Sequence, residues 1–410
     1  MTILVLNTGS SSVKFTLFQL PGESHLADGI VERIGLEGTK MVYNNHRGDK
    51  VHQPVQVGNT GDAVAEITKL LIHKADGVIR DKNQVVAVGH RVVHGGEKIT
   101  ASVIIDREVK QVIQEYSKLA PLHNPSNLKG IEACEKHFPD VPGVAVFDTA
   151  FHTTIPAHAY LYGLPHQMYS EDKIRRYGFH GTSHQYVCHA AADFLSRPAD
   201  DLKIISCHLG NGCSITAVDR GKSIDTSMGF TPLEGLMMGT RSGDIDPAIV
   251  FYLMEHKKLE PQQVRELLNK QSGLFGLAGI GSSDLRDIFA ARENGNRLAD
   301  TAIRTFVYRI KKYLGAYTAA LGGLDTIIFT AGIGENAPLV REMVCQNLEE
   351  LGIVIDSEKN AAGNQTIREI QHEDSRVNIL VIPTNEEKEI ALQVIKLLFT
   401  EMVQNNRVRS

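Results

Sequence analysis

Side chains capable of chemistry follow directly after several short apolar runs of the sequence. These segments are Asn7–Ser12, Gly89–Gly96, Asp148–His152, His208–Gly212, Thr330–Asn336 and Pro383–Glu387. Ligands of α/β sheets bind beyond the carboxyl ends of strands, so we expect the segments to line one shared cleft. Ordinary turns would explain the glycines and asparagines, but they explain Arg91, Asp148 and His208 poorly.

Two arginines stand in glycine-rich contexts. Arg91 precedes the stretch Val-Val-His-Gly-Gly, and Arg241 lies in Thr240–Asp244. A guanidinium binds carboxylates and phosphates through paired hydrogen bonds. Arginines that only form surface ion pairs seldom lie between glycines, so this context indicates recognition of an anionic substrate.

Glycine- and serine-rich turns predict phosphate binding, because their backbone amides can approach phosphate oxygens closely. Ser10, Ser11, Ser12 and Lys14 would add hydroxyl donors and a positive charge, but no GxxxxGK[ST] motif of a P-loop occurs. Gly332–Ala337 weakly matches the dinucleotide-binding fingerprint. That match alone would favour an NAD-dependent dehydrogenase, and it leaves the Asn7–Lys14 segment and Arg241 unexplained.

Two further patterns could suggest a metal. Asp244 and Asp246 could bind a cation, although a cap for a helix starting at Pro247 is at least as good an interpretation. His180 and His184 have the spacing of zinc ligands, but the Gly-Thr-Ser between them is a poor helix former and the Glu of HExxH is missing. A zinc site is therefore not expected.

The elements that must position these residues are of mixed type. Short β-branched runs indicate strands, and periodic segments at Ala63–Lys74, at Leu298–Ala320 and after Asn385 indicate helices, which together favour an α/β fold. Ile3–Leu17 resembles Ile204–Val218, and each reads as a strand, a polar turn and a second strand. We interpret the pair as a duplication, with chance similarity of two hairpins as the alternative.

The composition limits the class of protein. The chain has 410 residues, enough for two or three domains, and its net charge of −5 gives no sign of nucleic acid or an anionic membrane as a partner. Hydrophobic residues make up 42% and charged residues 22%, as in ordinary globular proteins. Five scattered cysteines, no signal-peptide pattern and no long apolar run lead us to expect a cytoplasmic protein with reduced thiols.

Taken together, the motifs resemble the acetokinase family of acetate and propionate kinases over essentially the whole chain. The matching stretches are Asn7–Phe15, Gly89–Gly96, Ala120–Asn124, Phe147–His152, Arg176–His184, His208–Gly212, Asp225–Gly229, Thr231–Asp244 and Ile382–Glu387. Any one of them is only suggestive, whereas all of them in this order are highly specific.

The resemblance implies an α/β fold of the duplicated actin-like ATPase type, shared with sugar kinases and chaperone ATPases, in which two lobes flank a central cleft. Residues 1–148 and 386–410 would form an acyl-binding lobe, and residues 149–385 a nucleotide-binding lobe. The implied reaction is reversible, direct in-line transfer of the γ-phosphoryl group of ATP to acetate, giving acetyl phosphate and ADP. It would need Mg²⁺, for which Mn²⁺ can substitute, and members of the family are usually homodimers.

The resemblance also assigns the site residues. Arg91 would hold the acetate carboxylate, while Arg241 and His180 would stabilise the equatorial phosphoryl oxygens. Asp148 matches the essential aspartate of the family, and we expect it to orient Arg91 or metal-bound water, because neither acetate nor the product needs a proton. Asn7 and Glu386 match the metal positions. ATP contacts match Ser10, Ser12, Lys14, His208, Leu209, Gly210, Asn211, Gly212, Asp284, Leu285, Arg286, Ala331, Gly332, Ile333, Gly334 and Glu335.

The size of the substrate can also be predicted. The methyl group of acetate would occupy a small apolar pocket that matches Val93, Leu122, Phe179 and Pro232. Relatives that prefer propionate tend to carry alanine in place of Val93, so valine here favours acetate. A propionate or butyrate kinase remains the alternative within the class. A non-catalytic nucleotide switch of the same fold would not explain Arg91, Asp148, His180 and Arg241.

Overall fold

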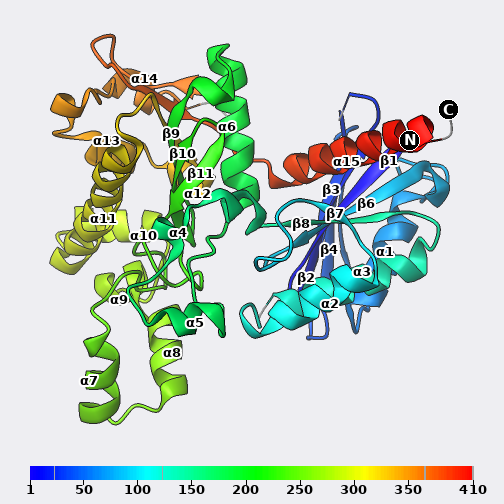
Figure 1. Ribbon diagram of the computed structural model, residues 1–410. Coiled ribbons are helices and arrows are strands. Elements are labelled where there is room, and N and C mark those ends of the chain that lie inside the picture. The colour runs from blue at the N-terminus through cyan, green and yellow to red at the C-terminus, as the bar shows by residue number, and fades with distance from the viewer. Residues whose placement is uncertain (23, 122, 364–365, 409–410) are drawn as a thin grey trace. The chain divides into compact units, whose positions relative to one another are not determined.

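The computed structural model describes residues 1–410 except residues 23, 122, 364–365 and 409–410, and it describes no side chains from residue 399 onward. The chain forms two compact units, the first from Met1–Phe151 with Asn385–Ser410 and the second from His152–Thr384 (Figure 1). Within the described residues, none of the helices is both long enough and apolar enough to cross a membrane.

The first unit is built on one mixed sheet with the strand order β5-β4-β3-β2-β1-β6-β8-β7. Its strands are β1 Thr2–Thr8, β2 Ser12–Gln19, β3 Ser24–Glu32, β4 Lys40–Asn45, β5 Lys50–Pro54, β6 Val85–Val92, β7 Val103–Ile104 and β8 Gly143–Phe147. β1 and β2 form the expected hairpin, while β6 and β8 run parallel to β1. The carboxyl ends of β1, β6 and β8 therefore point the same way.

Helices cover both faces of this sheet because the strands are apolar on both sides. They are α1 Thr60–Leu71, α2 Arg107–Glu115, α3 Asn124–His137 and α15 Glu386–Val408. Leu4 and Leu6 of β1 belong to a core with residues of α1 and α3, whereas Ile3 and Val5 pack with Ile390 and other residues of α15 (Figure 1). The alternation along β1 is what a strand between two helical layers requires.

The second unit repeats this plan, with the strand order β11-β10-β9-β12-β14-β13. Its strands are β9 Lys203–Leu209, β10 Cys213–Asp219, β11 Lys222–Thr226, β12 Thr326–Thr330, β13 Arg368–Glu369 and β14 Asn378–Val381. β9 and β10 form an antiparallel hairpin, and β12 and β14 run parallel to β9. The order β3-β2-β1-β6-β8 in the first unit thus corresponds to β11-β10-β9-β12-β14 here, as a duplication predicts.

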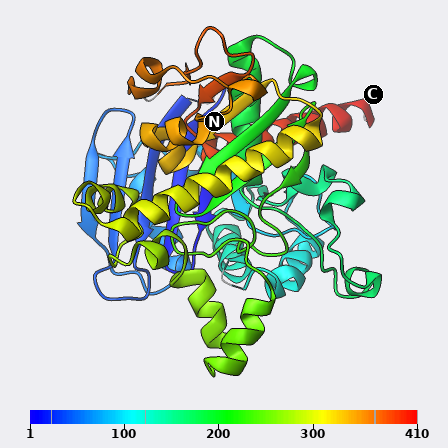
Figure 2. The ribbon, with the colours of Figure 1, turned by 90° about the vertical axis from the view of Figure 1, so that its left-hand side faces the viewer.

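The helices of the second unit differ more from those of the first. They are α4 Ala157–Tyr160, α5 His166–Ser170, α6 Gly181–Leu195, α7 Ala248–His256, α8 Pro261–Lys270, α9 Gly273–Ala278, α10 Leu285–Glu293, α11 Arg297–Leu321, α12 Ala331–Asn336, α13 Pro338–Cys345 and α14 Ser357–Ala361. The long α11 (yellow in Figure 2) buries the apolar stripe that includes Ala302, Phe306 and Leu314. It starts at an Asn296 cap and ends at Gly322, whose φ of 64° is left-handed.

Two local expectations need correction. β6 continues to Val92 and β9 continues to Leu209, so Arg91 and His208 are the last residues but one of strands and not parts of turns. The Gly-Thr-Ser stretch after His180, expected to be a poor helix former, opens α6 at Gly181. Buried packing of this first turn, in which Gly181, Thr182 and Ser183 are all inside, outweighs the weak intrinsic propensity.

Candidate functional site

In the first unit, the parallel strands bring three predicted residues to one edge of the sheet. Leu6 of β1 pairs with His90 of β6, and Val92 of β6 pairs with Phe147 of β8. Asn7, Arg91 and Asp148 therefore lie at neighbouring strand ends. This arrangement follows directly from the register, because the carboxyl ends of parallel strands share an edge.

Arg91 is the centre of this group. Its Nη2 donates to Oδ2 of Asp148 at 2.6 Å and its Nε donates to Oδ1 at 3.1 Å. Its Nη1 lies 3.4 Å from Oδ1 of Asn7, and its Nε lies 3.7 Å from Oε2 of Glu386 at the start of α15. The structure thus brings together Asn7, Arg91, Asp148 and Glu386, four of the residues that the family resemblance singles out.

Burial governs the charges of this group. Asp148 is 1% exposed, so its carboxylate depends on Arg91 for compensation. Burial alone would lower the pKa of Arg91, but the negative charges of Asp148 and Glu386 outweigh it and raise that pKa, so the guanidinium stays charged. Burial raises the pKa of the Glu386 carboxyl, and the charge of Arg91 opposes this only in part.

The same group has the oxygen chemistry that suits a hard divalent cation. Lys14 forms an ion pair with Glu387 at 2.5 Å, so three carboxylates (Asp148, Glu386 and Glu387) face two cations (Lys14 and Arg91). The excess of negative charge, together with the amide oxygen of Asn7, fits Mg²⁺, which takes one or two protein oxygens and completes its shell with water and phosphate. No group of three or more His, Cys, Asp or Glu side chains among the described residues forms a dedicated metal cage.

Two asparagines that sequence reasoning missed hold the neighbouring loop. Oδ1 of Asn127 accepts a hydrogen bond from the backbone N–H of Val93 at 3.2 Å, and Nδ2 of Asn127 donates to the carbonyl of Thr8 at 2.9 Å. Asn124 bonds both the N–H and the carbonyl of His94, at 3.1 and 2.9 Å. Both asparagines lie on α3, where a spacing of three residues places them on one face.

In the second unit, the two glycine-rich segments lie side by side. His208 of β9 pairs with Thr330 of β12, so the segments 208–212 and 331–335 leave neighbouring parallel strands. A side chain at Gly210 would lie 3.8 Å from Cβ of Ala331. Oε1 of Glu335 also accepts a hydrogen bond from the backbone of Thr384 at 3.1 Å, which ties the second segment to the end of β14.

Ala331, one of the predicted ATP contacts, has an unusual backbone conformation. Its φ of 64° is left-handed, a conformation that glycine adopts without strain and alanine does not. Ala331 opens α12, and Arg341 supports the segment from beneath, because its Nη1 donates to the carbonyls of Gly334 and Glu335 at 2.8 and 3.0 Å. Arg341 is 1% exposed, and no sequence pattern marked it as a site residue.

His180 and Arg241 flank the first glycine segment. A Cβ added at Gly212 would lie 3.4 Å from Nη1 of Arg241 and 3.7 Å from Nε2 of His180, so glycine leaves space beside both donors. Nη1 of Arg241 also donates to the carbonyl of Pro232 at 3.2 Å. Among the described residues no carboxylate pairs with Arg241, and burial lowers its pKa. A half-buried guanidinium of this kind is suited to receive an anion.

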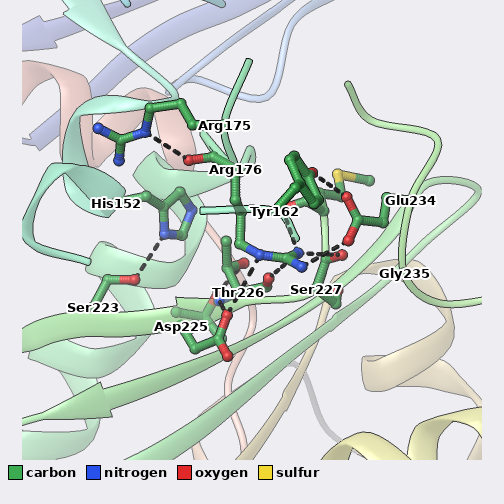
Figure 3. A network of polar contacts seen from close by, with 12 residues as sticks. His152, Tyr162, Arg175, Arg176, Ser223, Asp225, Thr226, Ser227, Glu234 and Gly235 are labelled. Carbon is green, nitrogen blue, oxygen red and sulfur yellow. Dashed lines mark hydrogen bonds and ion pairs between the residues drawn. The ribbon is translucent and has the colours of Figure 1, made fainter. Parts of the chain in front are cut away.

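A partly buried polar network around Arg176 and Glu234 holds the loop that leads to Arg241 (Figure 3). Nη2 of Arg176 donates to Oε1 of Glu234 at 2.6 Å, while its Nη1 donates to the carbonyls of Thr226 and Ser227 at 2.8 and 3.1 Å. The hydroxyl of Tyr162 donates to the same carboxylate, on Oε2. Burial is the largest cause that raises the pKa of Tyr162, so its hydroxyl stays protonated.

Asp244 fastens the far end of this loop. Its Oδ1 accepts from the backbone N–H of Gly235 and its Oδ2 from the hydroxyl of Tyr313, both at 2.7 Å. Asp246 accepts from the backbone N–H of Ala248 at 2.9 Å, at the start of α7. Asp246 thus binds the first turn of α7, although the N-cap position itself is Pro247, and both aspartates are engaged with protein donors.

The remaining predicted residues are placed as follows. Asp284 caps α10 and forms an ion pair with Arg286 at 2.6 Å. The side chain of Leu285, which lies between them in the sequence, is buried. The N–H of Gly9 bonds the carbonyl of Ser12 across the β1–β2 turn, which also contains Ser10. Of the predicted acyl pocket, Val93 belongs to the first unit, Phe179 and Pro232 belong to the second, and Leu122 lies outside the described residues.

Comparison with known proteins relates this geometry to a family. Residues 2–392 match the profile of the Acetokinase family. The acetate kinase of Dictyoglomus turgidum is 53% identical over 404 residues, covering 98% of this chain and 99% of that protein. The crystal structure of Porphyromonas gingivalis acetate kinase superposes with a TM-score of 0.93 at 47% identity, covering 97% of this chain and 99% of that one.

A propionate kinase from Francisella tularensis also superposes, with a TM-score of 0.88 at 42% identity and coverage of 96% of this chain and 98% of that one. Both solved structures span the whole architecture described above, so they share its two-sheet α/β fold. The profile match and the full-length identity show that this chain belongs to the acetokinase family.

Proposed function

We propose that this protein is an acetate kinase, a phosphotransferase that reversibly transfers the γ-phosphoryl group of ATP to acetate and forms acetyl phosphate and ADP. The observation that carries the proposal is the 53% identity to an acetate kinase over 98% of the chain. A relationship this close over both units makes a change of reaction class, such as an NAD-dependent dehydrogenase, hard to reconcile with the chain.

We assign acyl binding to the first unit, with Arg91 as the carboxylate anchor. Acetate is already a nucleophile at neutral pH, so the reaction needs positioning and charge neutralisation more than it needs a base. Asp148 engages Nε and Nη2 of Arg91 through two hydrogen bonds. This geometry supports a role for Asp148 in orienting Arg91, because a bidentate pair fixes the plane of the guanidinium.

We assign nucleotide binding to the second unit, through the segments 208–212 and 331–335 and the Asp284–Arg286 turn. Arg241 and His180 would donate to the equatorial oxygens of the transferring phosphoryl group, where negative charge concentrates in the transition state. Their common position beside Gly212 supports this assignment. Ser10, Ser12 and Lys14 of the first unit would contact phosphate oxygens.

We further propose Mg²⁺ as the metal, with Mn²⁺ as a substitute, held by Asn7 and Glu386. Both side chains offer oxygen ligands, and the group around them carries more carboxylates than cations. When bound, the metal would offset the negative charge of the ATP phosphates. Asn7 and Glu386 would then serve as anchors for water-bound metal, consistent with the few protein ligands that Mg²⁺ usually takes.

We also propose that the protein is a homodimer. Helix α7 has the sequence AIVFYLMEH, yet it has no buried residue, and Ile249, Phe251 and Tyr252 are 43%, 61% and 54% exposed. A surface this apolar marks a contact site, and its proposed occupant is a second copy of the chain. Sedimentation should then give twice the chain mass, and Phe251→Asp should shift it to the monomer.

One assay tests the proposed function. Purified protein is incubated with acetate and Mg·ATP, and acetyl phosphate is trapped as acetohydroxamate. We expect product that depends on both substrates and disappears with EDTA. Parallel reactions with propionate and butyrate test the alternative of a propionate or butyrate kinase, which a higher kcat/KM for the longer acids would establish. Folded protein that forms no acyl phosphate from any of the three would overturn the proposal.

A further inference from the structure

A buried chain of hydrogen bonds leads away from His180 into the second unit. Nδ1 of His180 lies 2.9 Å from Oγ of Ser214, and the same Oγ lies 2.7 Å from Nε2 of His184. Nδ1 of His184 lies in turn 2.9 Å from Oγ of Ser206. Ser206, Ser214 and His184 are each 0% exposed.

Secondary structure fixes every member of this chain. Ser206 lies on β9 and Ser214 on the paired β10, where Ser214 faces His208 in the register. His184 lies in the first turn of α6, and its backbone N–H donates to the carbonyl of His180 at 2.9 Å. The ring of His180 also stacks on that of His208, with centroids 4.1 Å apart. Stacking fixes the plane of the ring, while the bond to Ser214 fixes its rotation within that plane.

Counting protons shows why Ser214 matters. A neutral imidazole carries one N–H, and a hydroxyl carries one proton that it gives to one partner. Burial among other histidines lowers the pKa of His184, so this ring stays neutral. Ser214 can therefore donate to His180 only when His184 donates to Ser214, and it must accept from His180 when it donates to His184. The states of the two rings are coupled through one hydroxyl.

We propose that Ser214 is a positioning residue that donates its proton to Nδ1 of His180 and thereby holds His180 as the tautomer with its N–H on Nε2, supported by His184 and Ser206. This inference rests on the proposed function, in which His180 must donate from Nε2 to a phosphoryl oxygen. Nε2 of His180 and Nη1 of Arg241 border the same space at Gly212.

The test combines a spectroscopic signature with kinetics. In protein labelled with ¹⁵N in its imidazoles, with His180→Gln to assign the signals, His180 should show a protonated Nε2 and an unprotonated Nδ1. Ser214→Ala should mix the tautomers and lower kcat about tenfold to a hundredfold, as loss of an outer hydrogen-bond partner does elsewhere, with both KM values little changed. Ser214→Thr, which keeps the hydroxyl, should restore the signature and most of kcat.

The matched control is Thr216→Val on the same strand, whose lost hydroxyl contacts Thr226 at 2.8 Å and not a histidine. It should lower the thermal midpoint without altering the His180 signals. A wild-type His180 protonated on Nδ1, signals unchanged by Ser214→Ala, or equal kinetic losses in Ser214→Ala and Thr216→Val would each overturn the inference. The ¹⁵N signals of His180 in the wild-type protein test the inference about Ser214 even if no acetyl phosphate forms. Failure of this inference and failure of the proposed function can therefore be distinguished.

Discussion

Arg91 and Asp148 are joined side-on, with Nε and Nη2 of the guanidinium both directed at the carboxylate, at 3.1 and 2.6 Å. A guanidinium has a second pair of parallel donors at its far end, on Nη1 and Nη2. The Asp148 contact therefore orients Arg91 through Nε and Nη2, while Nη1 contacts Oδ1 of Asn7 at 3.4 Å. If Arg91 anchors acetate as proposed, the acetate carboxylate would bind at Nη1 and Nη2, beside Asn7.

The first prediction concerns this pair. Asp148→Asn should lower kcat/KM for acetate roughly 30-fold to several-thousand-fold, which corresponds to a loss of about 2–5 kcal/mol in transition-state binding. The reason is that Arg91 loses its orienting charge in a buried position. Arg91→Lys should act similarly, since an ammonium cannot reproduce two parallel hydrogen bonds. The measurement is acetyl phosphate formation at varied acetate.

The control for this pair is Glu115→Gln, which breaks the exposed ion pair with Lys98 and should leave kcat/KM unchanged. Retention of wild-type kcat/KM in Asp148→Asn would show that the carboxylate does not orient Arg91.

The second prediction concerns substrate size. Val93 is 6% exposed and its backbone is held by Asn127. If its side chain limits the size of the acyl pocket, Val93→Ala should lower the ratio of kcat/KM for acetate to kcat/KM for propionate. One methylene changes this discrimination by about 1–3 kcal/mol at most. Val92→Ala is the control, because Val92 packs in an apolar core with Ile131 and Phe147. Val92→Ala should lower the stability of the protein and leave the ratio of the two kcat/KM values unchanged. If Val93→Ala also left that ratio unchanged, Val93 would not line the acyl pocket.

The third prediction concerns the metal. Glu386→Gln should raise the concentration of Mg²⁺ needed for half-maximal activity, because a neutral amide binds a hard cation more weakly than a carboxylate. A second readout is the thermal midpoint with ADP present, which added Mg²⁺ should raise less in the variant than in the wild type. If Glu386→Gln and the wild type showed the same Mg²⁺ dependence in both measurements, Glu386 would not be a metal-binding residue.

Sequence patterns predicted the existence of the strands that lead to the predicted site residues, because that depends on local chemistry, but they ended β6 and β9 too early. The apolar runs before Asn7, Asp148 and Gly210 each form strands whose ends carry the expected residues. Arg176, Glu234 and Arg341 could not be predicted as supports, because each acts on backbone carbonyls or charges distant in sequence. Such contacts are products of tertiary packing, and no periodicity or turn signal encodes them.

The fourth prediction concerns the partly buried network around the Arg241 loop. Glu234→Gln should destabilise the second unit by about 1.5–3 kcal/mol, because the partly buried Arg176 keeps its charge and loses its charged partner at 2.6 Å. Tyr162→Phe removes a hydrogen bond to that carboxylate and one from the backbone N–H of Phe230, so about 1–3 kcal/mol is expected. Chemical unfolding followed by fluorescence or circular dichroism measures both.

A control for the network variants is Lys270→Gln, which breaks an exposed ion pair with Glu266 and should change stability by less than about 0.5 kcal/mol. If Glu234→Gln proved as mild as that control, the Arg176 network would not hold the loop.

The last prediction concerns acid stability and depends on His90. This side chain is 3% exposed, and burial lowers its pKa from 6.5 to about 3. Below pH 6.5 the unfolded chain therefore binds a proton on His90 that the folded protein does not bind. The contribution of His90 to folding stability is fully present above pH 6.5 and is lost progressively as the pH falls toward 3. Each pH unit in that window removes about 1.4 kcal/mol. His90→Gln, which cannot titrate, should make the unfolding midpoint of the first unit fall less steeply between pH 7 and 5. The exposed His52, replaced in the same way, should leave the slope as it is, and equal slopes in all three proteins would mean that His90 is protonated in the folded state.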